Sequence, residues 1–260
     1  MKKIVWLFFG VVIMIFALFL NYDYCYASDA CLLISDINSD SIDCIDKSVV
    51  EIENILKDQG TSVEKELINV RLKLLTDLEN TPKESPDYEK IKNLLCIVEN
   101  DLLLYEEKVP AVMANANGSR GLIDDGVVTI GAWFLANDYL LAWELLMHSR
   151  DNSNPYSIYY PLYGDRVLVS PFVIQARQGL HGVSGSSSFE NIGSTLQRDL
   201  YYAIHAYDYT YSSNTHRLTI YDVYDYEPEL YDGIAHTAIN IMYLAQLTGV
   251  ITPYNVRIIV

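Results

Sequence analysis

The sequence predicts an α+β fold: an N-terminal helical hairpin, followed by a C-terminal domain with an antiparallel Tyr-rich β-hairpin packed on helices. Apolar residues recur every three or four positions over residues 46–106, which is the period of an amphipathic helix. Residues 199–226 instead alternate in the manner of a β-hairpin around Ser212–Thr215, with tyrosine at many of the positions. A further apolar helix and a closing strand follow, so helices and strands are mixed in the C-terminal part.

The chain begins with a predicted export signal over residues 1–27. Lys2 and Lys3 precede an apolar run from Ile4 to Leu20, and Ala27 ends the segment. A positive start, an apolar centre and a small residue at the cleavage point are typical of a secretory signal. The apolar run is also at the lower limit of length for a membrane span, so an uncleaved anchor is the alternative. We expect a secreted or cell-surface protein that touches a membrane only through an uncleaved leader.

Charge and cysteine content narrow the classes of partner and site. The 260 residues include 34 acidic and 18 basic side chains, for a net charge of −16. Such an acidic protein repels phosphates, so we expect no nucleic-acid partner. Cys31 and Cys44 would close the shortest disulfide loop, which an oxidising compartment permits. Cys96 falls in a helical pattern and is expected to be a buried thiol.

The N-terminal part is predicted to be helical after a polar tail. One helix begins at about Asp46 and stops before Gly60. A second follows Thr61, which has capping-box spacing to Glu64, and a third opens at Ser85–Pro86. The last two should form an αα-hairpin whose charges are a solvated face without a catalytic role. The domain boundaries that follow are a signal peptide (1–27), a polar tail (28–45), a helical hairpin (46–106), a linker (107–130) and an α+β domain (131–260).

Within the α+β domain, the sequence predicts four elements besides the β-hairpin. These are a buried helix over 133–147, a helix from Ser170–Pro171 to about Gln178, a helix over 231–247 that Gly249 stops, and a closing strand over 252–260. The Gly/Ser-rich segment 179–188 is predicted to be a flexible surface loop. Glu144 and His148 stand four residues apart on the buried helix and are predicted to form a structural ion pair.

His205, Asp222 and His236 are the candidate catalytic residues. A hairpin loop of two or four residues places His205 opposite Asp222, and a carboxylate that holds an imidazole is part of many general-base and metal sites. His236 lies on the last helix and could line the same cleft. The alternative is a structural ion pair that locks the register of the hairpin.

Tyr207, Tyr209, Tyr221 and Tyr224 are the candidate binding residues. Rigid aromatic side chains with a polar end give contact area at low entropic cost, so they suit recognition of an extracellular protein or a glycan. The alternative is that these rings pack within the sheet, because tyrosine favours strands in any case.

No cofactor is expected, and no residue is assigned to a metal. The acidic run Asp222, Asp225, Glu227, Glu229 and Asp232 invites a calcium reading, since calcium binds closely spaced carboxylates. The EF-hand pattern fails, however, because Leu230 stands where the turn glycine belongs and His236 where the bidentate glutamate belongs.

The function that these features favour is that of an exported binding protein with a Tyr-rich surface. The alternative is a secreted hydrolase or effector toxin that uses His205 with Asp222.

Overall fold

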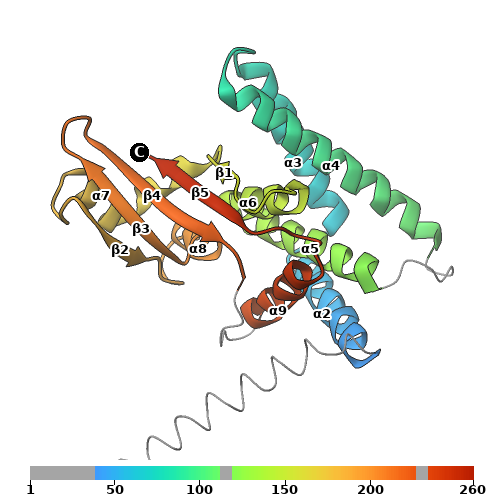
Figure 1. Ribbon diagram of the computed structural model, residues 1–260. Helices are drawn as coiled ribbons and strands as arrows, with labels where there is room; N and C mark the ends of the chain where they lie inside the picture. The colour runs from blue at the N-terminus through green and yellow to red at the C-terminus, as the bar shows by residue number, and fades with distance from the viewer. Residues whose placement is uncertain (1–38, 112–118, 227–233) are drawn as a thin grey trace, which may run out of the picture. The chain divides into compact units, whose positions relative to one another are not determined.

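A five-stranded sheet packs against helices, so the fold is α+β, as the sequence predicted (Figure 1). The computed structural model describes residues 39–111, 119–226 and 234–260. Residues 45–260 form one compact unit. The predicted signal peptide and the side chains of the predicted Cys31–Cys44 disulfide lie outside the described part of the chain.

Three helices open the described chain: α2 (Ser39–Asp58), α3 (Val63–Asn80) and α4 (Pro86–Ala111). Helices α3 and α4 pack side by side as the predicted hairpin (Figure 1). Each buries one apolar stripe, because its apolar residues recur at helical spacing. Cys96, which we predicted to be buried, is exposed since it lies outside that stripe. The buried residues of the two stripes are Val63, Leu67, Val70 and Leu74 on α3, and Ile91, Leu94, Leu95 and Val98 on α4.

The N-termini of two of these helices differ from the prediction. Helix α2 begins at Ser39, so the end of the predicted polar tail is helical. Ser62, and not Thr61, caps α3: its Oγ accepts a hydrogen bond from the amide of Lys65 at 3.2 Å. Thr61 instead donates to the carboxylate of Glu66, which the first turn of the helix brings beside it.

Helix α5 (Ser119–Ala136) occupies much of the segment 107–130 that we predicted to be a linker. Its glycines suggested a connection, but Gly126 serves close packing instead. A Cβ atom there would lie 2.8 Å from Cγ2 of Ile241 on helix α9 (Ile234–Leu247). Glycine therefore lets α9 approach the backbone of α5 more closely than any other residue would.

Helix α6 (Leu140–Asp151) follows α5 after a break, so the single helix predicted over 133–147 is wrong. The break lies at Asp138, whose φ of 58° is in the left-handed region that ends a helix. Tyr139 then returns its ring to α5, where it packs edge-on against Trp133 at a centroid distance of 5.7 Å.

Charged side chains tie α4, α5 and α6 together. Arg150 on α6 bonds Asp124 on α5 through Nε at 2.7 Å. It also bonds Asp101 on α4, whose side chain is buried. The helical hairpin therefore contributes a buried charge to the core, and its charges are not all solvated as we predicted.

The sheet has the strand order β1-β5-β4-β3-β2. Only the β1–β5 pair is parallel, and the other three pairs are antiparallel. The predicted hairpin forms β3 and β4, and the predicted closing strand, β5, pairs beside it. The strands are β1 (Ile158–Tyr159), β2 (Ser184–Ser188), β3 (Ala206–Ser212), β4 (Arg217–Tyr224) and β5 (Tyr254–Ile259).

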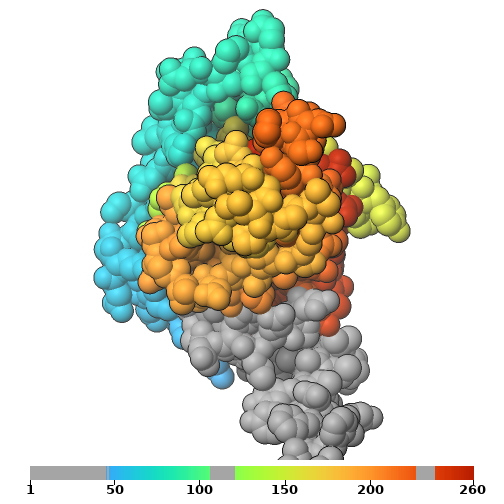
Figure 2. All heavy atoms as spheres, turned by 90° about the vertical axis from the view of Figure 1, so that its left-hand side faces the viewer, coloured from blue at the N-terminus to red at the C-terminus, as the bar shows by residue number. Residues whose placement is uncertain are grey.

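Strand β2 replaces part of the loop that we predicted over 179–188. Its Ser/Gly sequence carries no alternating pattern, and the pairing with β3 supplies its structure through backbone hydrogen bonds. Gly185 fits beneath Tyr209, since a Cβ would lie 2.8 Å from the tyrosine hydroxyl oxygen. Figure 2 views the molecule from this side, where the yellow and orange segments that include β2 form the front.

Three shorter elements and one further helix complete the unit. Residues 199–203, predicted to belong to the hairpin, are instead the end of α8, which begins with a capping box between Ser194 and Gln197. Ser170 caps α7 as predicted, since its Oγ accepts from the amide of Val173. The bounds are η1 (Gly164–Val169), α7 (Pro171–Arg177), α8 (Thr195–Ala203) and α9 (Ile234–Leu247). Within residues 39–111, 119–226 and 234–260, no helix is both long enough and apolar enough to cross a membrane.

Candidate functional site

The hairpin register does not place His205 opposite Asp222, so that prediction is wrong. The ladder pairs Asp208 with Tyr221 and ends with Ser212 opposite Arg217. The loop is therefore four residues long but lies one position later than predicted, with His216 at a φ of 53°. A shift of one position in the loop moves every pair by two residues.

This shift changes the cross-strand neighbour of Asp222 but not the face of the sheet to which its side chain points. Side chains along a strand alternate between the two faces, so a slip of two residues changes neighbours but not faces. Asp222 lies opposite Val256 of β5, on the face that Ile220 and Tyr224 also use. That face is turned toward the helices, and Asp222 is half-buried there.

His205 and Asp222 nevertheless line one cavity, of about 570 Å³. The cavity lies where the start of β3 and the end of β4 meet α5, α8 and α9. Three of the four predicted binding tyrosines, Tyr207, Tyr221 and Tyr224, line it as well. The lining also includes residues that we did not predict, among them Phe134, Tyr201, Tyr202, Tyr226 and Met242.

The tyrosines form the wall of a cavity and not an open recognition surface. Tyr207 and Tyr224 are each only 4% exposed, and the hydroxyls of Tyr224 and Tyr226 are hydrogen-bonded to each other. Tyr209 does not line the cavity. Its hydroxyl donates to the carbonyl of His181 at 2.7 Å, so its role is structural. Tyr221 is half-buried.

The cavity is acidic. Burial, together with the nearby charges of Asp225 and Asp208, raises the pKa of Asp222 to about 8. All three aspartates line the cavity, and among its described lining residues none is Lys or Arg. Asp222 is therefore largely protonated at neutral pH.

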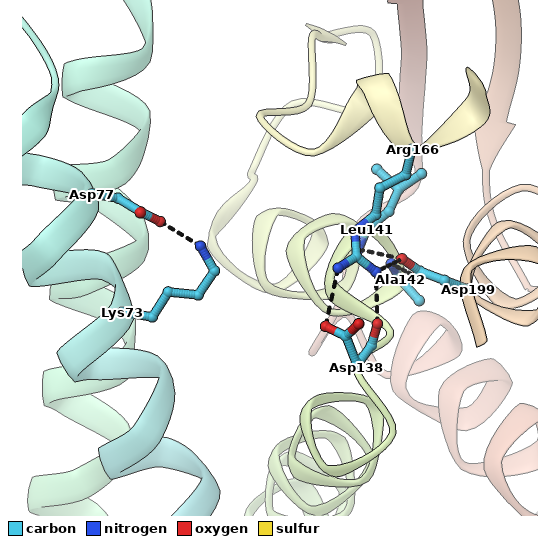
Figure 3. Close-up of polar contacts among 7 residues, drawn as sticks. All are labelled: Lys73, Asp77, Asp138, Leu141, Ala142, Arg166 and Asp199. Carbon is cyan, nitrogen blue, oxygen red and sulfur yellow. Dashed lines mark hydrogen bonds and ion pairs between the residues drawn. The ribbon is translucent and has the colours of Figure 1, made fainter. Parts of the chain in front are cut away.

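A buried ion pair fixes the scaffold beside α8 (Figure 3). Asp199 on α8 accepts hydrogen bonds from the amides of Leu141 and Ala142 at 3.1 and 2.9 Å. Asp199 thus caps the N-terminus of α6 from another helix. The N-cap residue of α6, Tyr139, makes no capping hydrogen bond with its own side chain. Arg166 bonds Asp199 at 2.6 Å and also the Asp138 carbonyl oxygen. This cluster is structural, since it holds α6, α8 and η1 together.

Glu144 is a second buried carboxylate, and the ion pair predicted with His148 does not form. Glu144 accepts hydrogen bonds from the Tyr159 hydroxyl at 2.7 Å and from the amides of Leu162 and Tyr163. Burial raises its pKa to about 7. His148 stacks on Tyr159 at a centroid distance of 3.8 Å, and burial lowers its pKa to about 4, so it is neutral.

The predicted catalytic side chain of His236 lies outside the described residues, as do Glu227, Glu229 and Asp232 of the acidic run. Within the described part of the chain, no group of three or more His, Cys, Asp or Glu side chains is arranged to hold a metal ion. The calcium reading and the role of His236 therefore stay predictions.

Comparisons with protein-family models, with curated proteins and with solved structures found no significant match for this chain.

Proposed function

We propose that this chain is an exported binding protein that holds its ligand in the tyrosine-lined cavity at the end of the β3–β4 hairpin. The observation that carries the proposal is the convergence of Tyr207 and Tyr224 with Asp222 on one cavity. Export rests on the predicted signal over residues 1–27.

The cavity has the size and composition of a ligand site. Small-molecule sites usually measure roughly 300–1,000 Å³ and combine apolar and aromatic walls with a few polar groups. Here aromatic rings and the apolar side chains of Ile130 and Met242 supply the walls. Asp222 and His205 supply polar groups among them. The ligand is part of an extracellular protein or a glycan, as the leader and the aromatic walls favour.

Filling the cavity tests the proposal. Ala238 lines it and is buried, so Ala238→Phe should occupy ligand space. We expect saturation-transfer NMR with a panel of sugars, amines and amino acids to detect a ligand of the wild type that Ala238→Phe no longer binds. Val183→Phe adds the same ring at a position that is 69% exposed and outside the cavity, and it should bind as the wild type does. A panel without any binder, or equal binding by Ala238→Phe, contradicts the proposal.

Hydrolysis is the second candidate function, and the protonated state of Asp222 favours it. A carboxyl that keeps its proton near pH 7 can act as a general acid in a cavity. His205 would then serve as the base. This candidate predicts that Asp222→Asn and His205→Ala each abolish the hydrolysis of a panel of nitrophenyl esters and glycosides while the thermal midpoint stays nearly unchanged. Activity that survives both changes contradicts it.

A further inference from the structure

We infer that the cavity accepts an organic ammonium group, held between tyrosine rings and the carboxylate of Asp222. The inference rests on the proposed function and deepens it by naming the chemical class of the ligand. Its components are the aromatic walls, the carboxyl of Asp222, which forms no ion pair with a basic side chain among the described residues, and the buried hydroxyl of Tyr207.

The aromatic walls suit a cation. Six aromatic residues besides His205 and Tyr221 line the cavity, and a ring face attracts a positive charge within about 6 Å of its centre. Such attraction strengthens when the cation leaves water, because little solvent then screens it. Tyr221 is left out because the Arg257 guanidinium already lies 5.2 Å from the centre of its ring. The six are Phe134, Tyr201, Tyr202, Tyr207, Tyr224 and Tyr226.

The charged residues of the lining also favour a cationic ligand. Asp208, Asp222 and Asp225 line the cavity, and no Lys or Arg stands among its described lining residues. Within the described residues, no ion pair of Asp222 with a basic side chain occurs. A cation bound beside Asp222 would favour the ionised form of its carboxyl, which burial otherwise disfavours, whereas phosphate or a carboxylate would be repelled.

Tyr207 gives an independent indication that a polar ligand group is missing. Its side chain is 4% exposed and lines the cavity. Within the described residues, no donor or acceptor lies within hydrogen-bonding geometry of its hydroxyl. Burial raises the pKa of Tyr207, and the nearby Ser187 side chain lowers it only in part. A buried polar group without a partner is costly, and a ligand with a polar head would satisfy this one.

Calorimetric titration of the purified protein with two cations and a neutral isostere tests the inference. Choline represents a free small ammonium, and Nα-acetyl-lysine methylamide represents a side chain of a partner protein. The neutral isostere is 3,3-dimethylbutanol, which has the shape of choline without the charge. We expect at least one cation to bind about tenfold more tightly than the isostere, and the tighter of the two identifies the source of the ammonium group.

Two variants make the result specific to the cavity. Asp222→Asn should weaken cation binding by about tenfold, and Asp165→Asn, an exposed aspartate outside the lining, should not. Equal binding of choline and its isostere would overturn the inference but leave the proposed function standing. Failure of both cations to bind overturns the inference as well. The proposed function falls with it only if the NMR panel also yields no ligand that Ala238→Phe displaces.

Discussion

The carboxylate of Asp199 contacts the guanidinium of Arg166 at 2.6 Å, and the Asp199 side chain has no exposed surface. The same carboxylate caps α6 through two backbone amides. The pair therefore joins three elements at one buried point (Figure 3), and α8, which it anchors, carries Tyr201 and Tyr202 into the cavity wall.

Loss of Asp199 should destabilise the fold strongly. Asp199→Ala leaves Arg166 without its buried partner and uncaps α6, and removing one member of a buried pair costs about 3–5 kcal/mol. Urea unfolding monitored by circular dichroism measures this loss. Asp199→Ala combined with Arg166→Met should recover part of the stability, because no buried charge is then left unpaired.

The matched control is an exposed pair. Glu89 and Lys92 lie 3.5 Å apart on α4, with side chains 66% and 60% exposed. Glu89→Gln should change the free energy of unfolding by less than about 0.5 kcal/mol. Similar losses for Glu89→Gln and Asp199→Ala would contradict the structural role of the buried pair.

Asp222 should make the wild type lose stability as the pH rises. The pKa of Asp222 is about 8 in the folded protein and 3.8 in its ordinary state. Its contribution to the free energy of unfolding is therefore complete below about pH 4 and is lost as the pH rises to 8. Asp222→Asn removes this loss. Chemical unfolding should show equal stabilities near pH 4 and a more stable variant at pH 8, by an amount on the order of a few kcal/mol. A variant that is less stable at pH 8 would show that Asp222 is not a desolvated carboxylate.

Glu144 holds the segment before η1, so its removal should be costly at every pH. Glu144→Ala leaves the amides of Leu162 and Tyr163 unpaired and opens a void, a loss of about 2–5 kcal/mol. The wild type itself loses stability as the pH rises from 4.5, the ordinary pKa of glutamate, to about 7, the folded value. The difference in the free energy of unfolding between the wild type and Glu144→Ala should therefore narrow over this pH range and then level off. Unfolding measured from pH 4 to 8 checks this, and a difference that widens would contradict it.

Gly126 should tolerate no side chain. Replacing glycine by alanine inside a helix usually stabilises it by roughly 0.5–1 kcal/mol, but the new Cβ would meet Cγ2 of Ile241 at 2.8 Å. We expect Gly126→Ala to destabilise by about 1–3 kcal/mol. Ile241→Leu removes the clashing methyl group, so the double variant should be more stable than the sum of the two single effects. Additive effects would show that the two residues do not touch.

The sequence was sufficient for the elements whose pattern is internal to the element. The stripes of α3 and α4 carry their own helical period, and Ser85–Pro86 and Ser170–Pro171 mark helix starts without reference to the rest of the fold. The alternation of β3 and β4 is likewise local. These elements were predicted for that reason.

Elements that depend on a distant partner were missed. Strand β2 is Ser/Gly-rich, and β3 supplies its structure through backbone pairing. Helix α5 was predicted to be a linker because a glycine inside a helix is unfavourable. The reason for Gly126, which is its close packing against α9, appears only in the folded structure. The hairpin register depended on one turn position, so His205 and Asp222 were predicted to pair when they share only a cavity. The buried pair of Arg166 and Asp199 had no signal in the sequence, since 33 residues separate them.

The most direct test of the cavity as the binding site is the NMR spectrum of protein with ¹³C-labelled tyrosine rings, recorded during a titration with choline. The account predicts that the ring signals of Tyr207 and Tyr224, which line the cavity, shift in proportion to its occupancy. Tyr209 lies outside the lining, so its signals should shift much less. Shifts confined to tyrosines outside the cavity, or no shift at saturating choline, would contradict it.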